Sequence, residues 1–338
     1  MKVSVLVAVY NAEKYLRECL ESLINQTHRD LQIVCIDDAS TDASWQILQE
    51  YARKDGRIVL IKQNENKGIA DTRNRGLQIA EGDYVTMLDS DDWLGTDALE
   101  QACKVASAKE DNDCVLLDVC QYDEVTGKTS GYNYCTEEED FTGNEAFRLS
   151  LDWGIHGLYI VRSSIHKQYP YDTTCRFYSD ENTTRLHFLH SRRVVRCHGI
   201  YYYRQHANSV THVVSSTRFM SLPAHYSMKQ TMLAEGVSEI LLNQYEEHRW
   251  RNLVGLYVFY RTNRSAFSGE ERRSIKEKLR YFHTTIEPHR LPVGLRRKFG
   301  YIPSPSFPRL YEVQNWLYLT IRRLSYHLRG KRSPEENA

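Results

Sequence analysis

The first hundred residues alternate between short apolar runs and segments of helical spacing, and this alternation restricts the fold more than any other feature. Apolar and β-branched residues fill positions 3–9, 31–36, 58–61 and 85–88. Between these runs, apolar residues recur every three or four positions, as from Leu16 to Ile24, which predicts helices. Strands with so little polarity, separated by helices, belong in a parallel sheet that is covered on both faces. We therefore predict an α/β fold.

Polar residues indicate where the helices begin and end. Asn11 is a candidate cap for the first helix, and Ser40 or Thr41 is expected to open the second. The third helix should run from about Ile69 to Ala80 and end near Gly82.

Polar clusters also follow three of the four predicted strands. They occupy positions 8–11, 37–40 and 89–91. In open α/β sheets, ligands bind beyond the carboxyl ends of the strands. We expect the three clusters to converge on one rim, where they could serve a base, a ribose and a metal-held diphosphate.

The most acidic cluster is Asp89-Ser90-Asp91-Asp92. Three carboxylates within four positions repel one another unless a cation compensates them. Carboxylate oxygens are hard ligands that suit Mg²⁺ or Mn²⁺, and these ions share their remaining positions with water and substrate phosphates. A solvated acidic turn is the alternative. Asp92 is expected to support the site rather than to bind the metal.

Other nucleotide-binding motifs are absent from the sequence. No Gly-x-Gly-x-x-Gly follows the first strand, and no Gly-x-x-x-x-Gly-Lys-Ser/Thr occurs anywhere. This argues against dinucleotide-binding and P-loop proteins. A nucleotidyltransferase is disfavoured too, because we would expect a Gly-rich phosphate loop near its N-terminus.

Composition adds the expectation of a reduced, cytosolic protein. No run of about 18 apolar residues offers a membrane span, and the first apolar run is too short for a signal peptide. The eight cysteines include no Cys-x-x-Cys pair, and several lie among apolar residues. Reduced core thiols are therefore expected, rather than disulfides or zinc ligands.

Four motifs in the first hundred residues together resemble the family 2 glycosyltransferases. They are the strand and its end at 3–11, Ile-Asp-Asp-Ala-Ser-Thr-Asp at 36–42, the segment 66–74, and the acidic segment 82–92. The order and spacing match over this region. The resemblance implies a GT-A (Rossmann-like) fold, a nucleotide-sugar donor, Mn²⁺ or Mg²⁺, and inversion at the anomeric carbon.

The resemblance also implies roles for individual donor-side residues. Ala8 and Tyr10 would line the base pocket, and Asp38 would hydrogen-bond the base. Arg73 would lie near the nucleotide, Asp89 near the ribose or the metal, and Asp91 would be the metal ligand. Structural roles remain the alternative, such as Tyr10 covering the core.

A second acidic pair, Asp180-Glu181, precedes a predicted helix that ends near Leu189. In the family, a pair of acids before a helix supplies the general base, with Glu first and Asp second. Here the order is reversed, so Glu181 matches by position and Asp180 by residue type. Either could instead favour the helix N-terminus electrostatically.

Two further segments carry candidate site residues. Trp153 and His156 lie on a Gly-containing loop and could stack against acceptor sugars, although a buried Trp could equally anchor the loop. The segment 201–212 resembles the family's Tyr-Arg-x-His element, in which Arg204 could neutralise phosphate and His206 could bind metal or phosphate. His206 and, less strongly, His212 are candidates with a structural alternative.

After about residue 215 the resemblance fades and helices are predicted at 220–235, 240–261, 270–283 and 316–328. Positions 290–332 carry many basic residues against the single acid Glu312. An apolar stripe from Trp316 to Leu328 is interrupted by arginines, which favours an anionic membrane surface as partner. Alternatively this helix packs on the catalytic domain.

Together these observations predict a GT-A catalytic domain at 1–215 (nucleotide-binding half 1–110, acceptor half 111–215) and a helical, basic region at 216–338. The predicted activity is inverting, metal-dependent transfer from a UDP-sugar to a hydroxyl of a glycan or lipid-linked acceptor in bacterial surface polysaccharide synthesis. We expect a cytoplasmic enzyme on the inner face of the cytoplasmic membrane, with no nucleic-acid partner. A catalytically degenerate nucleotide-sugar-binding or membrane-associated assembly protein is the alternative.

Overall fold

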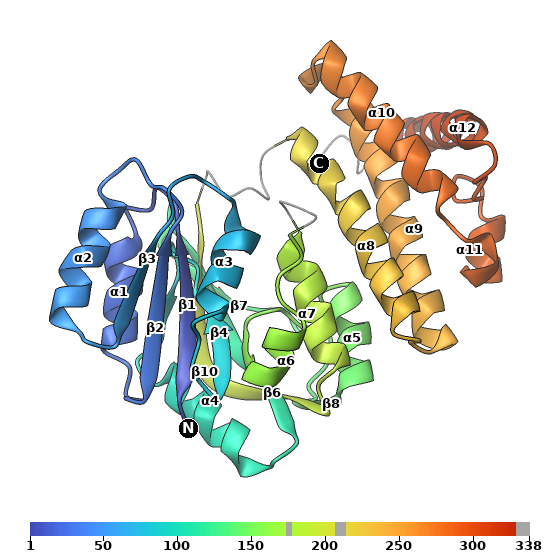
Figure 1. The fold of residues 1–338 in the computed structure, drawn as a ribbon. Helices are drawn as coiled ribbons and strands as arrows, with labels where there is room; N and C mark the ends of the chain where they lie inside the picture. The colour runs from blue at the N-terminus through green and yellow to red at the C-terminus, as the bar shows by residue number, and fades with distance from the viewer. Residues whose placement is uncertain (174–177, 207–213, 329–338) are drawn as a thin grey trace. The chain divides into compact units, whose positions relative to one another are not determined.

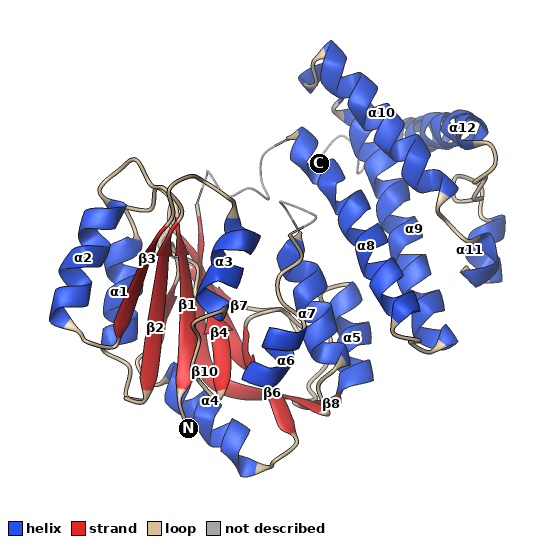
Figure 2. Ribbon diagram, viewed as in Figure 1, coloured by secondary structure: helices blue, strands red, loops and turns tan. Residues whose placement is uncertain are grey.

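The computed structural model describes residues 1–173, 178–206 and 214–328. Within it the chain forms two compact units, Met1–Thr211 and His212–Ala338. The first combines a central sheet with covering helices, and the second consists of helices (Figures 1 and 2).

The N-terminal half of the sheet has the parallel α/β arrangement predicted from the sequence. Its strands are β1 (Val3–Val9), β2 (Leu31–Asp37), β3 (Ile58–Lys62) and β4 (Tyr84–Met87), in the order β3-β2-β1-β4. All neighbouring pairs are parallel, and Val9 lies opposite Asp37 in the register. The connecting helices are α1 (Leu16–Ile24), α2 (Ser44–Lys54) and α3 (Ile69–Leu77).

Alternate residues of these strands point into two separate hydrophobic clusters. Val5 and Val7 pack in one cluster with residues of α1 and α2 such as Leu20. Leu6 belongs to the other cluster, together with Leu77 of α3. Both faces of the sheet are therefore covered, which explains the nearly continuous apolar sequence of its strands.

The helix starts differ from those predicted. Asn11 does not cap α1; it has φ of 49° and lies in the loop before the helix, which begins at Leu16. Its side-chain oxygen accepts a hydrogen bond from the Thr41 backbone N–H at 2.8 Å, and its own N–H donates to the Ser40 hydroxyl at 3.0 Å. Ser40 and Thr41 therefore hydrogen-bond to Asn11 in the neighbouring loop instead of capping α2, which begins at Ser44.

The second half of the sheet is mixed. It continues as β4-β9-β6-β10-β5, formed by β9 (Tyr159–Arg162), β6 (Asn112–Asp123), β10 (Arg193–Gln205) and β5 (Trp93–Leu94). β9 is antiparallel to both of its neighbours, whereas β10 is parallel to β6. The apolar and aromatic residues at 194–197 and 200–204 predict two short strands, but both segments belong to β10, which has a register shift between Arg196 and Ile200.

Smaller elements complete the first unit. β7 (Thr129–Gly131) pairs antiparallel with β6 and forms a hairpin with it. The remaining elements are α4 (Ala98–Ala108), β8 (Asp140–Thr142), α5 (Gly143–Leu151), α6 (Ser163–Gln168) and α7 (Ser179–Leu189). α5 begins at Gly143, where Thr142 and Glu145 form a capping box.

The cysteines lie mainly in the interior. Five of the seven described cysteines are buried: Cys19, Cys35, Cys103, Cys114 and Cys197. Burial raises the pKa of Cys35 to about 12, so this thiol is protonated at neutral pH. Cys175 lies outside the described residues.

The helical unit contains η2 (Ser216–Met220), α8 (Ser221–Ala234), α9 (Glu239–Thr262), η3 (Arg264–Ala266), α10 (Gly269–Thr284), η4 (Pro288–Arg290), α11 (Val293–Arg297) and α12 (Pro308–Leu328). Its core includes Trp250, Tyr257 and Tyr311. α12 begins eight residues before the predicted start, at a proline, which fits the first turn of a helix. Among the described residues, no helix is long and apolar enough to cross a membrane.

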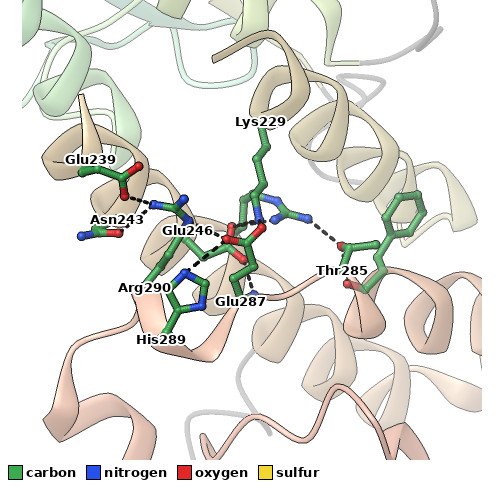
Figure 3. Close-up of polar contacts among 10 residues, drawn as sticks. Lys229, Glu239, Asn243, Glu246, Thr285, Glu287, His289 and Arg290 are labelled. Atoms are coloured by element: carbon green, nitrogen blue, oxygen red, sulfur yellow. Dashed lines mark hydrogen bonds and ion pairs between the residues drawn. The ribbon is translucent and has the colours of Figure 1, made fainter. Parts of the chain in front are cut away.

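A buried network of charges ties α8 and α9 to the segment before η4 (Figure 3). The Lys229 ammonium lies 3.1 Å from a Glu246 oxygen and 2.8 Å from a Glu287 oxygen. Arg249 donates to the same Glu246 oxygen at 2.6 Å, and the Glu287 backbone N–H donates to the other at 2.7 Å. Glu246 is fully buried, and protein groups hydrogen-bond to both of its oxygens.

Candidate active site

A cavity of about 810 Å³ opens beyond the carboxyl ends of β1, β2 and β4, at the rim predicted from the sequence. Nine of the residues expected at the site line it: Ala8, Tyr10, Asp38, Arg73, Asp89, Asp91, Asp180, Arg204 and His206. Glu181, Trp153 and His156 are not among the lining residues. Tyr203, the tyrosine of the Tyr-Arg-x-His element, also lines the cavity. Tyr15 and Tyr178 line it too and had no signal in the sequence, because only the tertiary fold brings their rings to this rim.

Asp89 is held by an arginine that is almost completely buried. Arg73, on α3, donates to Asp89 Oδ1 at 2.5 Å, and its guanidinium lies 5.3 Å from the Tyr171 ring centroid. Burial alone would lower the pKa of Arg73, but the negative charges of Asp89 and other nearby groups outweigh it and raise the pKa. Arg73 thus fixes the orientation of Asp89 while remaining charged.

Asp91 is paired with an imidazole across the cavity. The His206 Nε2 lies 3.1 Å from Asp91 Oδ2, and the His206 ring stacks on Tyr15 with centroids 5.6 Å apart. Asp91 keeps about a third of its side chain exposed. These two residues are 115 positions apart in the sequence. They form a pair because the end of β10 lies beside the acidic turn.

Asp92 points away from solvent and joins the acidic turn to β10. Its oxygens accept hydrogen bonds from the Tyr201 hydroxyl at 2.8 Å and from the Arg204 backbone N–H at 2.7 Å. Burial, together with the neighbouring carboxylates Asp89 and Asp91, raises its pKa to about 8. Asp92 therefore has the supporting position that was expected.

Arg204 is fixed from several sides. Its Nε donates to the Asp91 carbonyl at 2.8 Å, and its guanidinium forms an ion pair with Glu18. The guanidinium also lies 4.6 Å from the Trp93 ring centroid and 4.9 Å from that of Tyr15. Cation–π contacts and the ion pair place a fixed positive charge at the cavity wall.

Asp38 organises the loop that leads into α3. Its carboxylate accepts hydrogen bonds from the backbone N–H groups of Lys67 at 2.8 Å and Gly68 at 2.9 Å, and from the Gln63 side chain at 2.7 Å. It is 3% exposed. By contrast, Tyr10 is half exposed at the cavity edge, and Ala8 lies beside it near the end of β1.

The two acids of the second pair, Asp180 and Glu181, lie in different environments. Asp180 lines the cavity, whereas Glu181 pairs with the buried Arg185 at 3.2 Å, one turn further along α7. Desolvation raises the pKa of Asp180, and the nearby charges of Glu181 and Asp89 add to this, while Arg73 opposes it. Tyr178, just before the helix, has φ of 68°, an unfavourable value for a tyrosine that sets the helix entry.

Trp153 and His156 lie away from the cavity. His156 is buried; its Nε2 lies 2.7 Å from the Tyr134 hydroxyl, and its Nδ1 accepts from the Leu158 N–H at 3.2 Å. Burial lowers its pKa to about 3, so the ring is neutral. Trp153 is partly exposed, with the Arg185 guanidinium 5.7 Å from its ring. His212 and positions 207–211 lie outside the described residues.

The donor groups at the cavity suit a hard divalent cation that also binds a ligand. Asp91 presents a carboxylate beside the His206 imidazole, and the second Asp89 oxygen is not the one held by Arg73. Within the described ranges, no group of three or more His, Cys, Asp or Glu residues could hold a metal by itself. The residues present fit an ion that takes its remaining ligands from substrate phosphates and water.

The chain is similar to known glycosyltransferases. The family model "Glycosyl transferase family 2" matches residues 4–169. The putative glycosyltransferase EpsH of Bacillus subtilis is 32% identical over 255 residues, which are 73% of this chain and 72% of EpsH. The Escherichia coli enzyme WfaP, named as a UDP-Glc:α-D-GlcNAc-diphosphoundecaprenol β-1,3-glucosyltransferase, is 43% identical over 95 residues, covering 28% of this chain and 37% of WfaP.

A crystal structure of S. aureus TarS in complex with UDP-GlcNAc has the same fold. The TM-score is 0.72 at 21% sequence identity, and the match covers 94% of this chain and 89% of that chain. The sheet, the cavity and this match define a GT-A fold with a helical C-terminal region. The chain belongs to glycosyltransferase family 2, and it is a glycosyltransferase.

Proposed function

We propose that the protein transfers a sugar, with inversion, from a UDP-sugar to a hydroxyl of a glycan or lipid-linked acceptor, and that the reaction depends on Mn²⁺ or Mg²⁺. The biological setting is the synthesis of a bacterial surface polysaccharide: capsule, O-antigen or exopolysaccharide. The observation that carries the proposal is that one cavity is lined both by Asp89 and Asp91 after β4 and by Asp180 of α7. The UDP-GlcNAc complex of TarS and the UDP-Glc donor in the name of WfaP support the choice of UDP.

On the donor side, Asp91, with His206 beside it, is the group we assign to holding the metal. Arg73 keeps Asp89 oriented, and Arg204 adds a fixed positive charge for the diphosphate. A bound divalent ion would neutralise charge on the departing diphosphate. Ala8 and Tyr10 are the residues proposed to line the base pocket, and Asp38 holds the loop 63–68 and thereby shapes that pocket.

On the acceptor side, Asp180 is the proposed general base. The acceptor oxygen bonds to the anomeric carbon while the bond from that carbon to the diphosphate oxygen breaks, and the hydroxyl proton passes to the Asp180 carboxylate. The raised pKa of Asp180 suits this role, because a more basic carboxylate is a better proton acceptor. Glu181 instead neutralises buried Arg185. Of the two readings left open by the sequence, the geometry favours Asp180.

The acceptor and the location are proposed together. The name of WfaP specifies a diphosphoundecaprenol-linked acceptor. We propose an acceptor of this lipid-linked class or a growing glycan, with the enzyme at the inner face of the bacterial cytoplasmic membrane.

The test is to measure donor binding and turnover in the full chain and in Asp91→Asn. UDP-sugars with Mn²⁺ should raise the thermal midpoint of the wild type, and release of UDP from the donor should depend on the metal. In Asp91→Asn we expect turnover to fall by at least ~100-fold, because an electrostatic contribution to the leaving group is lost. The exposed Asp97→Asn, six positions away and outside the cavity, is the matched control.

Several outcomes would contradict the proposal. Stabilisation by GDP-sugars alone would exclude UDP as the donor base, and full turnover in Asp91→Asn would exclude the metal role. UDP-sugar binding without any hydrolysis or transfer, even with glycan and lipid-linked acceptors supplied, would favour a degenerate binding protein.

A further inference from the structure

The helical unit contains a second cavity, of about 350 Å³, lined by residues of α9, η3, α10 and α12. Three of its lining residues are cationic: Arg261, Arg264 and Lys276. Two tyrosines, Tyr257 and Tyr260, and the indole of Trp316 also line it. This combination of positive charge and aromatic rings is unrelated to the residues that we assign to sugar transfer.

The charge of this cavity is not balanced by protein groups. Glu312 is its one lining carboxylate, and this group already pairs with Arg280 at 2.6 and 3.0 Å. Among the described residues, neither Arg264 nor Lys276 forms an ion pair. The contrast with the Glu246 network of the same unit is clear, since every charged group there has a partner of opposite sign. An anion bound in the cavity would supply the missing charge.

Two of the tyrosines that line the cavity have hydroxyls without a hydrogen-bond partner among the described residues. The hydroxyl oxygens of Tyr257 and Tyr260 are buried, and neither has a partner within the part of the chain that the structure describes. The two side chains are 3% and 6% exposed. A buried polar group without a partner is destabilising, so the protein around this cavity leaves two donors unsatisfied.

The neighbouring surface is apolar. α12 packs on the unit through Tyr311, Asn315 and Leu319, which are almost completely buried. Its opposite face exposes an apolar stripe of Leu310, Val313, Leu317, Ile321 and Leu324, each at least 40% exposed. The three- and four-residue spacing places these side chains on one side of the helix.

Trp316 connects the stripe to the cavity, because it lines the cavity and is also 53% exposed. The segment that leads to α12 and the first turn of α12 carry three exposed basic side chains, Arg297, Lys298 and Arg309. The only acid in the described part of 291–328 is Glu312, which is paired. A second copy of this surface would bring like charges together, whereas an anionic lipid surface complements both the charge and the apolar stripe.

We propose that this cavity binds the phosphate headgroup of an anionic membrane lipid, with Trp316 and the apolar stripe of α12 inserted beside it at the acyl boundary. Arg264 and Lys276 would contact the phosphate, and Arg297, Lys298 and Arg309 would lie near the surrounding headgroups. The inference deepens the proposed membrane location by naming the residues that achieve it. It does not depend on sugar transfer, since lipid binding is measured without donor or acceptor.

The experiment is flotation of the full chain with vesicles of phosphatidylcholine, alone or mixed with phosphatidylglycerol. Wild type should float with the mixed vesicles only, and less at high salt. Arg264→Gln/Lys276→Gln should bind roughly 25-fold more weakly, about fivefold for each charge near the surface. Trp316→Ser/Leu317→Ser should also lose binding although no charge changes. The matched control Arg53→Gln/Lys104→Gln removes the same charges from exposed sites in the other unit and should bind within about twofold of wild type, since those charges lie outside the lipid site.

Three results would overturn the inference: no flotation of wild type with the mixed vesicles, equal binding by the cavity variant and its control, or full binding by the Trp316→Ser/Leu317→Ser variant. Glycerol 3-phosphate and inorganic phosphate distinguish the source of the anion. If either protects the unit against thermal unfolding through Arg264 and Lys276 while vesicles do not bind, the cavity takes a soluble phosphate and the membrane proposal is wrong. Circular dichroism melting of each variant verifies folding, and unchanged donor hydrolysis separates this test from that of the transferase.

Discussion

The two units handle buried and half-buried charge in opposite ways. At the catalytic cavity, Asp89 and Asp91 each keep about a third of the side chain exposed, and each has one oxygen close to a side-chain nitrogen, of Arg73 and of His206 respectively. In the helical unit, Glu246 is completely buried and both of its oxygens are occupied. We call a carboxylate open when it faces a cavity and has an oxygen without a protein partner, and closed when protein groups hold it. An open carboxylate can bind a ligand, whereas a closed one stabilises the fold. The same chemical group, a carboxylate, therefore belongs to a candidate site in one unit and to a structural network in the other.

The largest expected effect comes from the pair in which an open and a closed carboxylate are neighbours. Asp180→Asn should reduce kcat by roughly a hundredfold to ten-thousandfold, the usual contribution of a general base. Glu181→Gln should retain kcat within about tenfold, because Glu181 pairs with Arg185 rather than facing the cavity. Single-turnover transfer with saturating donor measures both. The reverse order of effects would assign the base to Glu181.

The next effect tests the closed network. Glu246→Gln leaves Lys229 and Arg249 without their shared counter-charge, and breaking a buried pair in this way costs about 3–5 kcal/mol. The adjacent Glu247→Gln removes only a part-exposed pair with Arg251 and should cost less than about 1 kcal/mol. Urea unfolding of the full chain gives both values. Equal costs would show that the network contributes nothing beyond a surface ion pair.

A smaller effect concerns pH in the helical unit. His283 is fully buried, and burial lowers its pKa to about 4. Below pH 6.5 the unfolded chain binds a proton that the folded chain excludes, so stability falls as pH decreases from 6.5 towards 4. Between pH 7 and pH 5 this amounts to about 2 kcal/mol.

Substitution separates this contribution from the rest of the pH dependence. His283→Gln should flatten the dependence of unfolding free energy on pH in that window, while retaining an acceptor for the Ser304 N–H. His289→Gln, which removes an exposed imidazole, is the control. If the slope of unfolding free energy against pH is the same in His283→Gln as in the wild type, protonation of His283 does not contribute to the pH dependence of stability.

The sequence predicted the fold of the first hundred residues well because the signal there is local. Each strand is a continuous apolar run with polar residues at its end, and parallel pairing aligns those ends. Helix starts were less predictable, since Asn11 and Ser40 have the residue types of caps but bond to each other across two loops. The single strand β10 was read as two because its register shift depends on pairing with β6, which no local pattern encodes.

The candidate site was predicted in composition more than in arrangement. The cavity is lined by most of the residues named from the motifs, yet the sequence could not separate Asp180 from Glu181, because the distinction depends on a partner one turn away. His156 has the residue type of a ligand-binding group but is buried against Tyr134. The roles assigned to these residues in binding and catalysis remain predictions. Neighbours contributed by distant segments are what local reasoning lacks.

The hydrogen bonds of Asp92 have a consequence for how the protein is made. The turn that carries the acids is secured by Tyr201 and by the Arg204 backbone, 112 positions later in the chain. While the ribosome is still synthesising the intervening segment, the emerging polypeptide holds Asp89, Asp91 and Asp92 together without those partners. We therefore expect the acidic turn to reach its final shape only after β10 has left the exit tunnel. A chain that ends before that point should have the strands of the nucleotide-binding half without a finished site.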